Sequence, residues 1–484
     1  MPSTILGFNK QSLAFSFILL CYTSSFATNF YGVLPQRVIH YTCLEQQQQN
    51  STTTCDSKTV SDISTRRIAY LNIAFSGACF LTNGPLSRYA DITSNRKGIL
   101  LYIIAGLTFD QVTQYFSTSY LQMVIFHAVS GCMGNLYITL ALLFSFIADA
   151  SNTMSNATPE EKTMQRRKDY GLAEGSIYVG VMLGPALGGI IFKVTKSFTI
   201  PYLASSGLSI VLFLSVLIFL PKDASRDTTN ANALSNSLLR DVVVDPQPEE
   251  EQEKETDSEP TVAWWNPFSP FILLFCRKER LIWSSILLMA WLGQKGIQFV
   301  YNPFIHYQYH SGAFLIGIVA IVLSLSSVFS NLFCMRIFSQ CKMKGETIIL
   351  IGCSLLIGAY CLIGFGGSNK PGSETPPSSF WIGVSLTGLA AFLSPILRSL
   401  MTGTVNKEER TVNAVTLLGG IAAIESFCDF AVPFIYGFGF WDYLVTLGKP
   451  AYVFLGGVFF YFLAGATVVI CGRGKVAVTR SSST

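Results

Sequence analysis

The sequence predicts an all-α membrane protein of about twelve transmembrane helices, arranged as two pseudo-symmetric six-helix bundles. Of its 484 residues, 50% are hydrophobic and only 13% are charged, whereas a soluble domain carries charge on about 25% of its residues. Its apolar stretches are about 20 residues long, which is the length of helix that crosses the core of a bilayer. One long polar segment near the middle of the chain divides these stretches into two sets, which is typical of proteins built from two repeated halves.

Each apolar stretch predicts one membrane span. The spans are expected near residues 11–33, 66–86, 98–115, 121–148, 170–193, 199–220, 281–303, 312–335, 347–367, 380–402, 412–437 and 451–472. The first stretch follows Lys10 and contains small residues at Ser25 and Ala27, so a cleaved signal peptide is an alternative. The stretch continues to Val33, which is longer than a signal peptide core, and its removal would leave an odd number of spans. An uncleaved first helix is therefore favoured.

Basic residues predict the orientation of the spans. Lys and Arg concentrate in segments that would lie on the same side of the membrane as the N-terminus. Because cytoplasmic loops are enriched in these residues, both termini are expected to be cytoplasmic. This orientation places the loop 34–65 outside, where the sequon that begins at Asn50 would be glycosylated. Cys43 and Cys55 share this loop and form a candidate disulfide.

The polar segment in the middle of the chain, residues 222–266, is rich in acidic residues and proline. Such a composition cannot bury a core, so we expect a disordered cytoplasmic linker. The predicted domains are therefore an N-terminal bundle at 1–221, the linker at 222–266, and a C-terminal bundle with a short cytoplasmic tail at 267–484.

A motif of small residues marks the fifth predicted span. It consists of Gly180, Gly184, Pro185, Gly188 and Gly189. Glycines that recur on one helical face permit close helix packing, and a proline within the helix favours a bend. The pattern GxxxGPxxGG resembles the fifth-helix motif of major facilitator transporters, especially their drug:proton antiporter branch. The resemblance implies that this helix controls packing during a conformational transition.

The segment between the second and third spans is similar to a loop pattern of the same superfamily, Gly-x-Leu-x-Asp followed by a basic cluster. Here the pattern begins at Gly84 and ends with Arg96 and Lys97. Arg88 occupies the position expected to be Asp, and Asp91 follows three residues later. The resemblance implies a gating loop whose usual charge contact with neighbouring helix ends is either rebuilt or absent.

Two further segments narrow the resemblance. In the fourth span, His127 stands at the arginine position of the family pattern Arg-x-x-x-Gly-x-x-Gly. In the second half, residues 393–400, 406–410 and 424–426 are similar to tetracycline-resistance-like efflux proteins, hippocampus-abundant-transcript proteins and the proton-coupled folate transporter group. These motifs specify a superfamily much better than they specify a substrate.

Ionisable residues within predicted spans are candidates for function because their burial in a membrane is costly. Lys295 lies in the seventh span, and Glu425 and Asp429 share one face of the eleventh span at i, i+4 spacing. An ion pair between Lys295 and either carboxylate would line a central cavity or hold helices together. His127 is either a proton-binding site or a neutral histidine bonded to a neighbouring helix. Asp110 is a proton site, a partner of His127, or a residue near the outer interface.

The sequence contains no signature of catalysis. It lacks a nucleotide-binding loop, a nucleophile elbow and metal-ligand spacing, and its polar segments are too short for a catalytic domain. No enzyme activity, cofactor, metal site or nucleic-acid partner is therefore expected.

The predicted function is secondary active transport of a small organic solute by alternating access, with protons as a candidate coupling ion. The protein is expected to act as a monomer in the lipid bilayer, at the plasma membrane or an endomembrane such as that of the vacuole or lysosome. A sensor or scaffold that keeps the fold, and binds partners through the linker and tail, is the alternative. Deletion of residues 230–258 should separate the two, since a transporter would retain flux.

Overall fold

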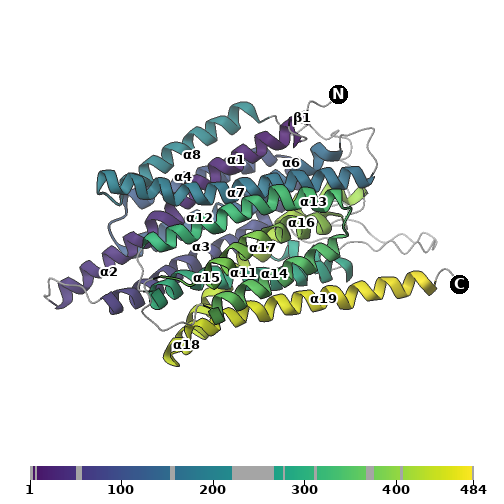
Figure 1. Cartoon of the computed structure of the whole chain (residues 1–484). Coiled ribbons are helices and arrows are strands. Elements are labelled where there is room, and N and C mark those ends of the chain that lie inside the picture. Colours follow the sequence, from purple (N-terminus) through teal and green to yellow (C-terminus); the bar gives the residue numbers. More distant parts are fainter. Residues whose placement is uncertain are drawn as a thin grey trace, which may run out of the picture.

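Long helices that lie side by side form almost the entire described part of the protein (Figure 1). The computed structural model describes residues 4–5, 8–50, 57–152, 159–220, 266–275, 278–309, 313–366, 375–403 and 407–481. Both termini lie at the same end of the bundle (Figure 1). The linker predicted at 222–266 falls outside the described residues except for Asn266.

The elements before the linker form the first half of the bundle. They are the hairpin strands β1 (Thr4–Ile5) and β2 (Phe8–Asn9), then α1 (Lys10–Ala27), η1 (Thr28–Val33), α2 (Leu34–Asn50), α3 (Ser57–Thr93), α4 (Arg96–Phe116), α5 (Tyr120–Cys132), α6 (Leu136–Asn152), α7 (Pro159–Thr195) and α8 (Ile200–Phe219). The all-α prediction is confirmed, apart from this short hairpin.

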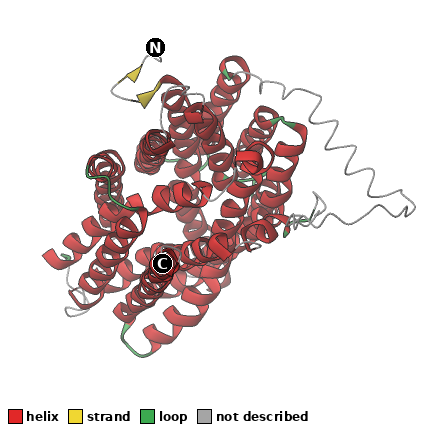
Figure 2. Cartoon of the chain, turned by 90° about the vertical axis from the view of Figure 1, so that its right-hand side faces the viewer, coloured by secondary structure: helices red, strands yellow, loops and turns green. Residues whose placement is uncertain are grey.

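The elements after the linker form the second half. They are α10 (Ser269–Phe275), α11 (Lys278–Tyr309), α12 (Ala313–Phe329), η2 (Ser330–Cys334), α13 (Met335–Gln340), α14 (Gly345–Gly366), α15 (Ser378–Leu389), η3 (Ala390–Phe392), α16 (Leu393–Gly403), α17 (Lys407–Val432), η4 (Pro433–Trp441), α18 (Asp442–Thr446), η5 (Pro450–Tyr452) and α19 (Val453–Ser481). Viewed from the end at which both termini lie, the helices are seen nearly end-on (Figure 2).

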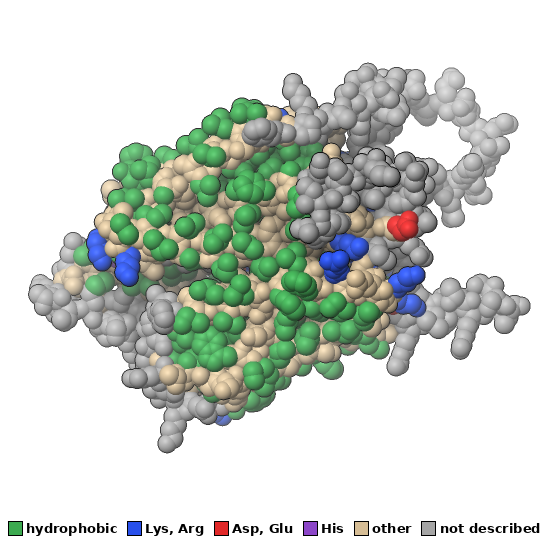
Figure 3. Space-filling model, turned by 45° about the horizontal axis from the view of Figure 1, so that its top comes forward, with side chains coloured by type: hydrophobic (Ala, Val, Ile, Leu, Met, Phe, Trp, Pro, Cys, Tyr) green, Lys and Arg blue, Asp and Glu red, His purple; other side chains and the backbone are tan. Residues whose placement is uncertain are grey.

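The outer surface of the bundle matches a bilayer. Hydrophobic side chains cover the middle of the face seen in Figure 3, and the visible Lys and Arg side chains lie toward its two ends. Within the described residues, ten helical segments are long and apolar enough to cross a membrane. The predicted second and seventh spans correspond to α3 and α11, two long helices that carry more polar residues toward the interior. About twelve spans therefore agree with the fold.

The fourth predicted span is two helices rather than one. It is interrupted between α5 and α6, where Gly134 has a φ of +103°. A side chain there would be strained, and its Cβ would lie 3.0 Å from atoms of Ile103 and Ile138. Asn135 then starts α6, because its side-chain oxygen accepts hydrogen bonds from the backbone N–H groups of Tyr137 (3.0 Å) and Ile138 (3.3 Å). This cap fixes the position of Tyr137, which belongs to the candidate site.

The predicted outer loop 34–65 is largely helical, since α2 continues the first span. The buried Arg37 on α2 explains part of this order, because it donates hydrogen bonds to the carbonyl oxygens of Gln114 and Ser117 at the end of α4. Cys43 is disulfide-bonded, whereas Cys55 lies outside the described residues. Asn50 ends α2, and the rest of its sequon lies outside them as well.

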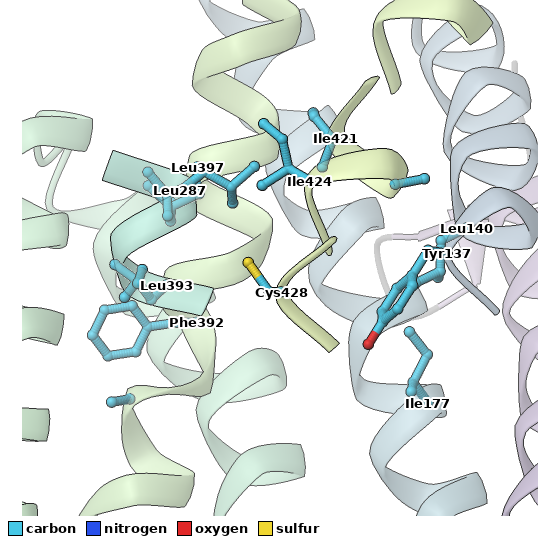
Figure 4. Close-up of a cluster of buried hydrophobic side chains, with 14 of the residues drawn as sticks. Tyr137, Leu140, Ile177, Leu287, Phe392, Leu393, Leu397, Ile421, Ile424 and Cys428 are labelled. Atoms are coloured by element: carbon cyan, nitrogen blue, oxygen red, sulfur yellow. The ribbon is translucent and has the colours of Figure 1, made fainter. Parts of the chain in front are cut away.

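Apolar side chains fill the space between the halves. Figure 4 shows Ile421, Ile424 and Cys428 of α17 between Tyr137 on one side and Leu397 on the other. Close contact of α17 with α3 depends on a glycine, because a Cβ added to Gly419 would lie 2.1 Å from the side chain of Ser87. The polar residues of the site are therefore embedded in a tightly packed interior.

Candidate functional site

A lysine and an aspartate of the second half meet a tyrosine of the first half. The ammonium nitrogen of Lys295 on α11 lies 3.4 Å from Asp429 Oδ1 on α17. The other oxygen of this carboxylate accepts a hydrogen bond of 2.5 Å from the hydroxyl of Tyr137 on α6. The Lys295 and Asp429 side chains keep 13% and 26% of their surface exposed. Of the two carboxylates expected to meet Lys295, Asp429 is the one in contact with it.

Glu425 has a different partner, the buried guanidinium of Arg398 on α16. Arg398 Nη2 donates a hydrogen bond to Glu425 Oε1, and Arg398 Nε lies 3.4 Å from Glu174 Oε1 on α7. Ser394 donates a further hydrogen bond of 3.0 Å to Glu174. Glu174 belongs to the first half and the other three residues to the second. This arrangement is an ion-pair network across the interface between the halves.

The network is dry. Glu425 has no exposed surface and Arg398 and Glu174 are almost fully buried, and the guanidinium also lies 5.1 Å from the ring centroid of Phe144. Among the described residues, Glu425 Oε2 has no hydrogen-bond partner. Breaking a buried ion pair by removal of one partner is strongly destabilising. Removal of any one of these charged residues should therefore destabilise the protein.

His127 and Asp110 form a separate pair within the first half. His127 Nδ1 lies 2.9 Å from Asp110 Oδ1, and both side chains are buried. The imidazole stacks on Phe75 and Phe30, with ring centroids 4.5 and 5.7 Å apart. Of the alternatives for Asp110, the partner of His127 is the one in the structure.

The C-terminal turn of α3 contacts the second half through Asp91. The Asp91 carboxylate accepts hydrogen bonds of 2.6 Å from both the backbone N–H and the hydroxyl of Thr416 on α17. A hydrogen-bonded contact of this motif with α17 is thus made by Asp91, three positions after Arg88. Lys97 donates hydrogen bonds to the carbonyl oxygens of Leu217 and Leu220, which neutralises the C-terminal end of α8.

Other members of the same loop motif have structural contacts. Gly84 lies within α3, whose helix continues to Thr93. The guanidinium of Arg96, at the start of α4, lies 5.6 Å from the ring centroid of Phe146. The contact of Asp91 with Thr416 joins the two halves, whereas the contacts of Lys97 and Arg96 lie within the first half.

The small-residue motif of α7 packs against α1. A Cβ added to Gly180 would lie 1.9 Å from Thr23 Oγ1, and one added to Gly184 would lie 2.7 Å from Ala27 Cβ. Gly188 is also in tight contact, whereas a Cβ at Gly189 would meet nothing within 4 Å. The motif therefore contains three packing glycines, and Gly189 is not one of them. Pro185 lies within α7, which continues through it.

Three residues of the site were not among the sequence candidates: Glu174, Arg398 and Tyr137. Glu174 and Arg398 are ionisable and lie within the predicted fifth and tenth spans, so the rule that identified Lys295 would also have found them. Tyr137 carries no such signal, because tyrosine is common in apolar segments. In the described part of the chain, no group of three His, Cys, Asp or Glu side chains is placed to hold a metal ion.

Long apolar helices around a buried polar interior define a multi-pass integral membrane protein. A family model described as Major Facilitator Superfamily matches residues 13–426, and the chain therefore belongs to the major facilitator superfamily of membrane transporters. The resemblance seen in its motifs is confirmed.

Individual relatives agree with this assignment. The chain is 24% identical over 359 residues to the class H tetracycline resistance protein of Pasteurella multocida, covering 73% of this chain and 76% of that protein. It is 27% identical over 167 residues to the efflux pump azaK of Aspergillus niger, covering 32% and 33% of the two chains. The crystal structure of the human organic anion transporter MFSD10 (TETRAN) has the same fold, with a TM-score of 0.66, 15% identity, and coverage of 95% and 99%.

Proposed function

We propose that this chain is a secondary active transporter that moves a small organic solute by alternating access, coupled to protons. The observation that carries the proposal is the ion-pair network in which Glu174 of the first half meets Arg398 and Glu425 of the second. A buried ion pair between two halves that move opposes their separation, because each charged side chain would lose its partner. The opposition ends when one of the side chains loses its charge. Protonation or solute binding can supply that change, and so couple a gradient to the movement of the halves.

The relatives support this reading. Two of them are named as a resistance protein and an efflux pump, and membrane proteins of this superfamily have two related halves around a central site. We assign residues 1–221 and 267–484 to these halves and place both termini in the cytoplasm. This orientation would make Asn50 an outer glycosylation site and place the candidate disulfide of Cys43 and Cys55 in an outer loop.

The test is flux in proteoliposomes that contain the purified protein and are subjected to a pH jump. A mixture of organic anions, cations and neutral solutes serves as the screen. We expect a solute whose flux depends on the pH gradient. In Glu425→Gln, which keeps the shape of the side chain but cannot bind a proton, this dependence should disappear. Glu45→Gln is the matched control, because Glu45 pairs with Arg67 on the surface of α2.

Two results would refute the proposal. One is an absence of flux for every solute in folded, correctly inserted protein, which would favour a sensor or scaffold. The other is flux with the same pH dependence in Glu425→Gln and in the wild type, which would remove the carboxylate from the coupling mechanism.

A further inference from the structure

The ammonium group of Lys295 occupies a seat built by three other side chains. Its nitrogen lies 5.2 Å from the ring centroid of Tyr137, 5.1 Å from that of Trp291, and 3.4 Å from Asp429 Oδ1. The two rings have centroids 6.0 Å apart and meet at 75°, so they form a corner. Two aromatic rings and a carboxylate are the groups with which proteins recognise alkylammonium ions. We call Tyr137, Trp291 and Asp429 the ammonium seat.

The ammonium seat is held in place independently of Lys295. The hydroxyl of Tyr137 donates a hydrogen bond of 2.5 Å to Asp429 Oδ2, which fixes the ring and the carboxylate relative to each other. Tyr137 comes from the first half, whereas Trp291 and Asp429 come from the second. The seat therefore forms where the two halves meet, and the Asp429 side chain keeps 26% of its surface exposed.

The charges around the seat favour a cation. Glu425 lies within electrostatic range of Arg398, Glu174, Lys295 and Asp429. Three carboxylates and two basic groups give this cluster of described residues a formal charge of −1 when all are ionised. An anion that approached Lys295 would also approach this excess of negative charge, at a depth where solvent screens little. A cation would neutralise it.

We propose that the transported solute is an organic cation whose ammonium group displaces Lys295 from the ammonium seat. This inference rests on the proposed function and names the class of solute. Lys295 acts as a tethered occupant that keeps the seat filled when no solute is bound. When the ammonium group of the solute replaces that of Lys295, the number of charges in the seat stays the same. The Asp429 carboxylate therefore has a cationic partner both before and after the solute binds.

The test is ligand-induced thermal stabilisation of the purified full-length protein in detergent, which needs no flux. Butylammonium reproduces the end of the lysine side chain, and butanol and butyrate are its uncharged and anionic counterparts. Removal of a tethered competitor raises apparent affinity, so butylammonium should bind Lys295→Ala at least about tenfold more tightly than the wild type. Trp291→Leu added to Lys295→Ala should weaken this binding about fivefold.

The matched control is Lys449→Ala, because Lys449 lies 5.6 Å from the ring centroid of a single tyrosine, Tyr452, at the surface. This variant should respond to butylammonium as the wild type does. The wild type itself should show the same preference for butylammonium over butyrate at higher concentrations, so the result does not depend on recovery of folded Lys295→Ala.

Stabilisation of the wild type by butyrate, lost in Lys295→Ala, would overturn the inference and make Lys295 an anion receptor. A lack of response to butylammonium in both proteins would overturn it too. The two proposals fail separately. Flux of anions alone would refute the proposal of a cation site and leave the proposal of transport standing. Binding of butylammonium without flux of any solute would refute the proposal of transport and leave the proposal of a cation site standing.

Discussion

Replacement of a single glycine in α7 should show how closely α1 and α7 depend on each other. In Gly184→Ala, the new methyl group would lie 2.7 Å from Ala27 Cβ and from Thr28 N, and 2.8 Å from Ser24 O. Non-bonded carbon atoms in good contact are about 3.5 to 4.0 Å apart. The two helices must therefore separate by about 1 Å along this line.

The cost follows from the contacts that change. Overpacking of a well-packed interior costs about 1–3 kcal/mol. The hydrogen bond of 3.1 Å from Thr28 Oγ1 to Gly184 O would be weakened, at a cost of about 1 kcal/mol. The higher helix propensity of alanine offsets about 1 kcal/mol of this. We expect Gly184→Ala to be less stable than the wild type by about 1–3 kcal/mol.

Gly189→Ala is the matched control, since a Cβ there meets nothing within 4 Å. It should be as stable as the wild type or more stable by up to about 1 kcal/mol. The assay is the fraction of each purified protein that remains monodisperse on size-exclusion chromatography after heating through a temperature series. Equal survival of Gly184→Ala and Gly189→Ala would refute the packing argument.

Two further predictions concern the contacts between the halves. Arg398→Met should destabilise the protein by about 3–5 kcal/mol, because two carboxylates would stay buried without their cation. Glu425→Gln, added as a second change, should restore part of this stability because it removes one of the two charges; the same heating assay measures both, and wild-type stability of Arg398→Met would contradict the prediction. Asp91→Ala should cost about 1.5–3 kcal/mol through the lost hydrogen bonds to Thr416, whereas the exposed Thr93→Ala should change little. A double-mutant cycle of Asp91→Ala with Thr416→Val measures the coupling, and additive effects would disprove it.

The sequence predicted the parts of the fold that depend on local pattern. Hydropathy along the chain identified the spans, because a helix that crosses the bilayer contains a stretch of about 20 predominantly apolar residues. Helical periodicity likewise predicted a packing face from Gly180 and Gly184, which are four residues apart. Gly189 does not share this face, and the motif assigned it to the packing surface only because it stands next to Gly188.

Other features depend on contacts between distant segments. The interruption of the fourth span at Gly134 depends on the left-handed backbone of one residue, which a hydropathy pattern does not contain. Lys295 had two candidate carboxylates one helical turn apart, and only the positions of α11, α16 and α17 decide between them. Glu425 pairs with Arg398, and Lys295 pairs with Asp429.

The interactions around Arg398 divide unequally between the halves of the chain. Glu425 and Ser394 belong to the second half with Arg398, whereas Glu174 stands alone on α7. If α7 and α16 moved apart, Arg398 would keep Glu425, but Glu174 would lose both its cation and its hydroxyl donor. A carboxylate stripped in this way must take up water or a proton during the movement itself. Any separation of α7 from α16 would therefore be coupled to the hydration or protonation of one side chain.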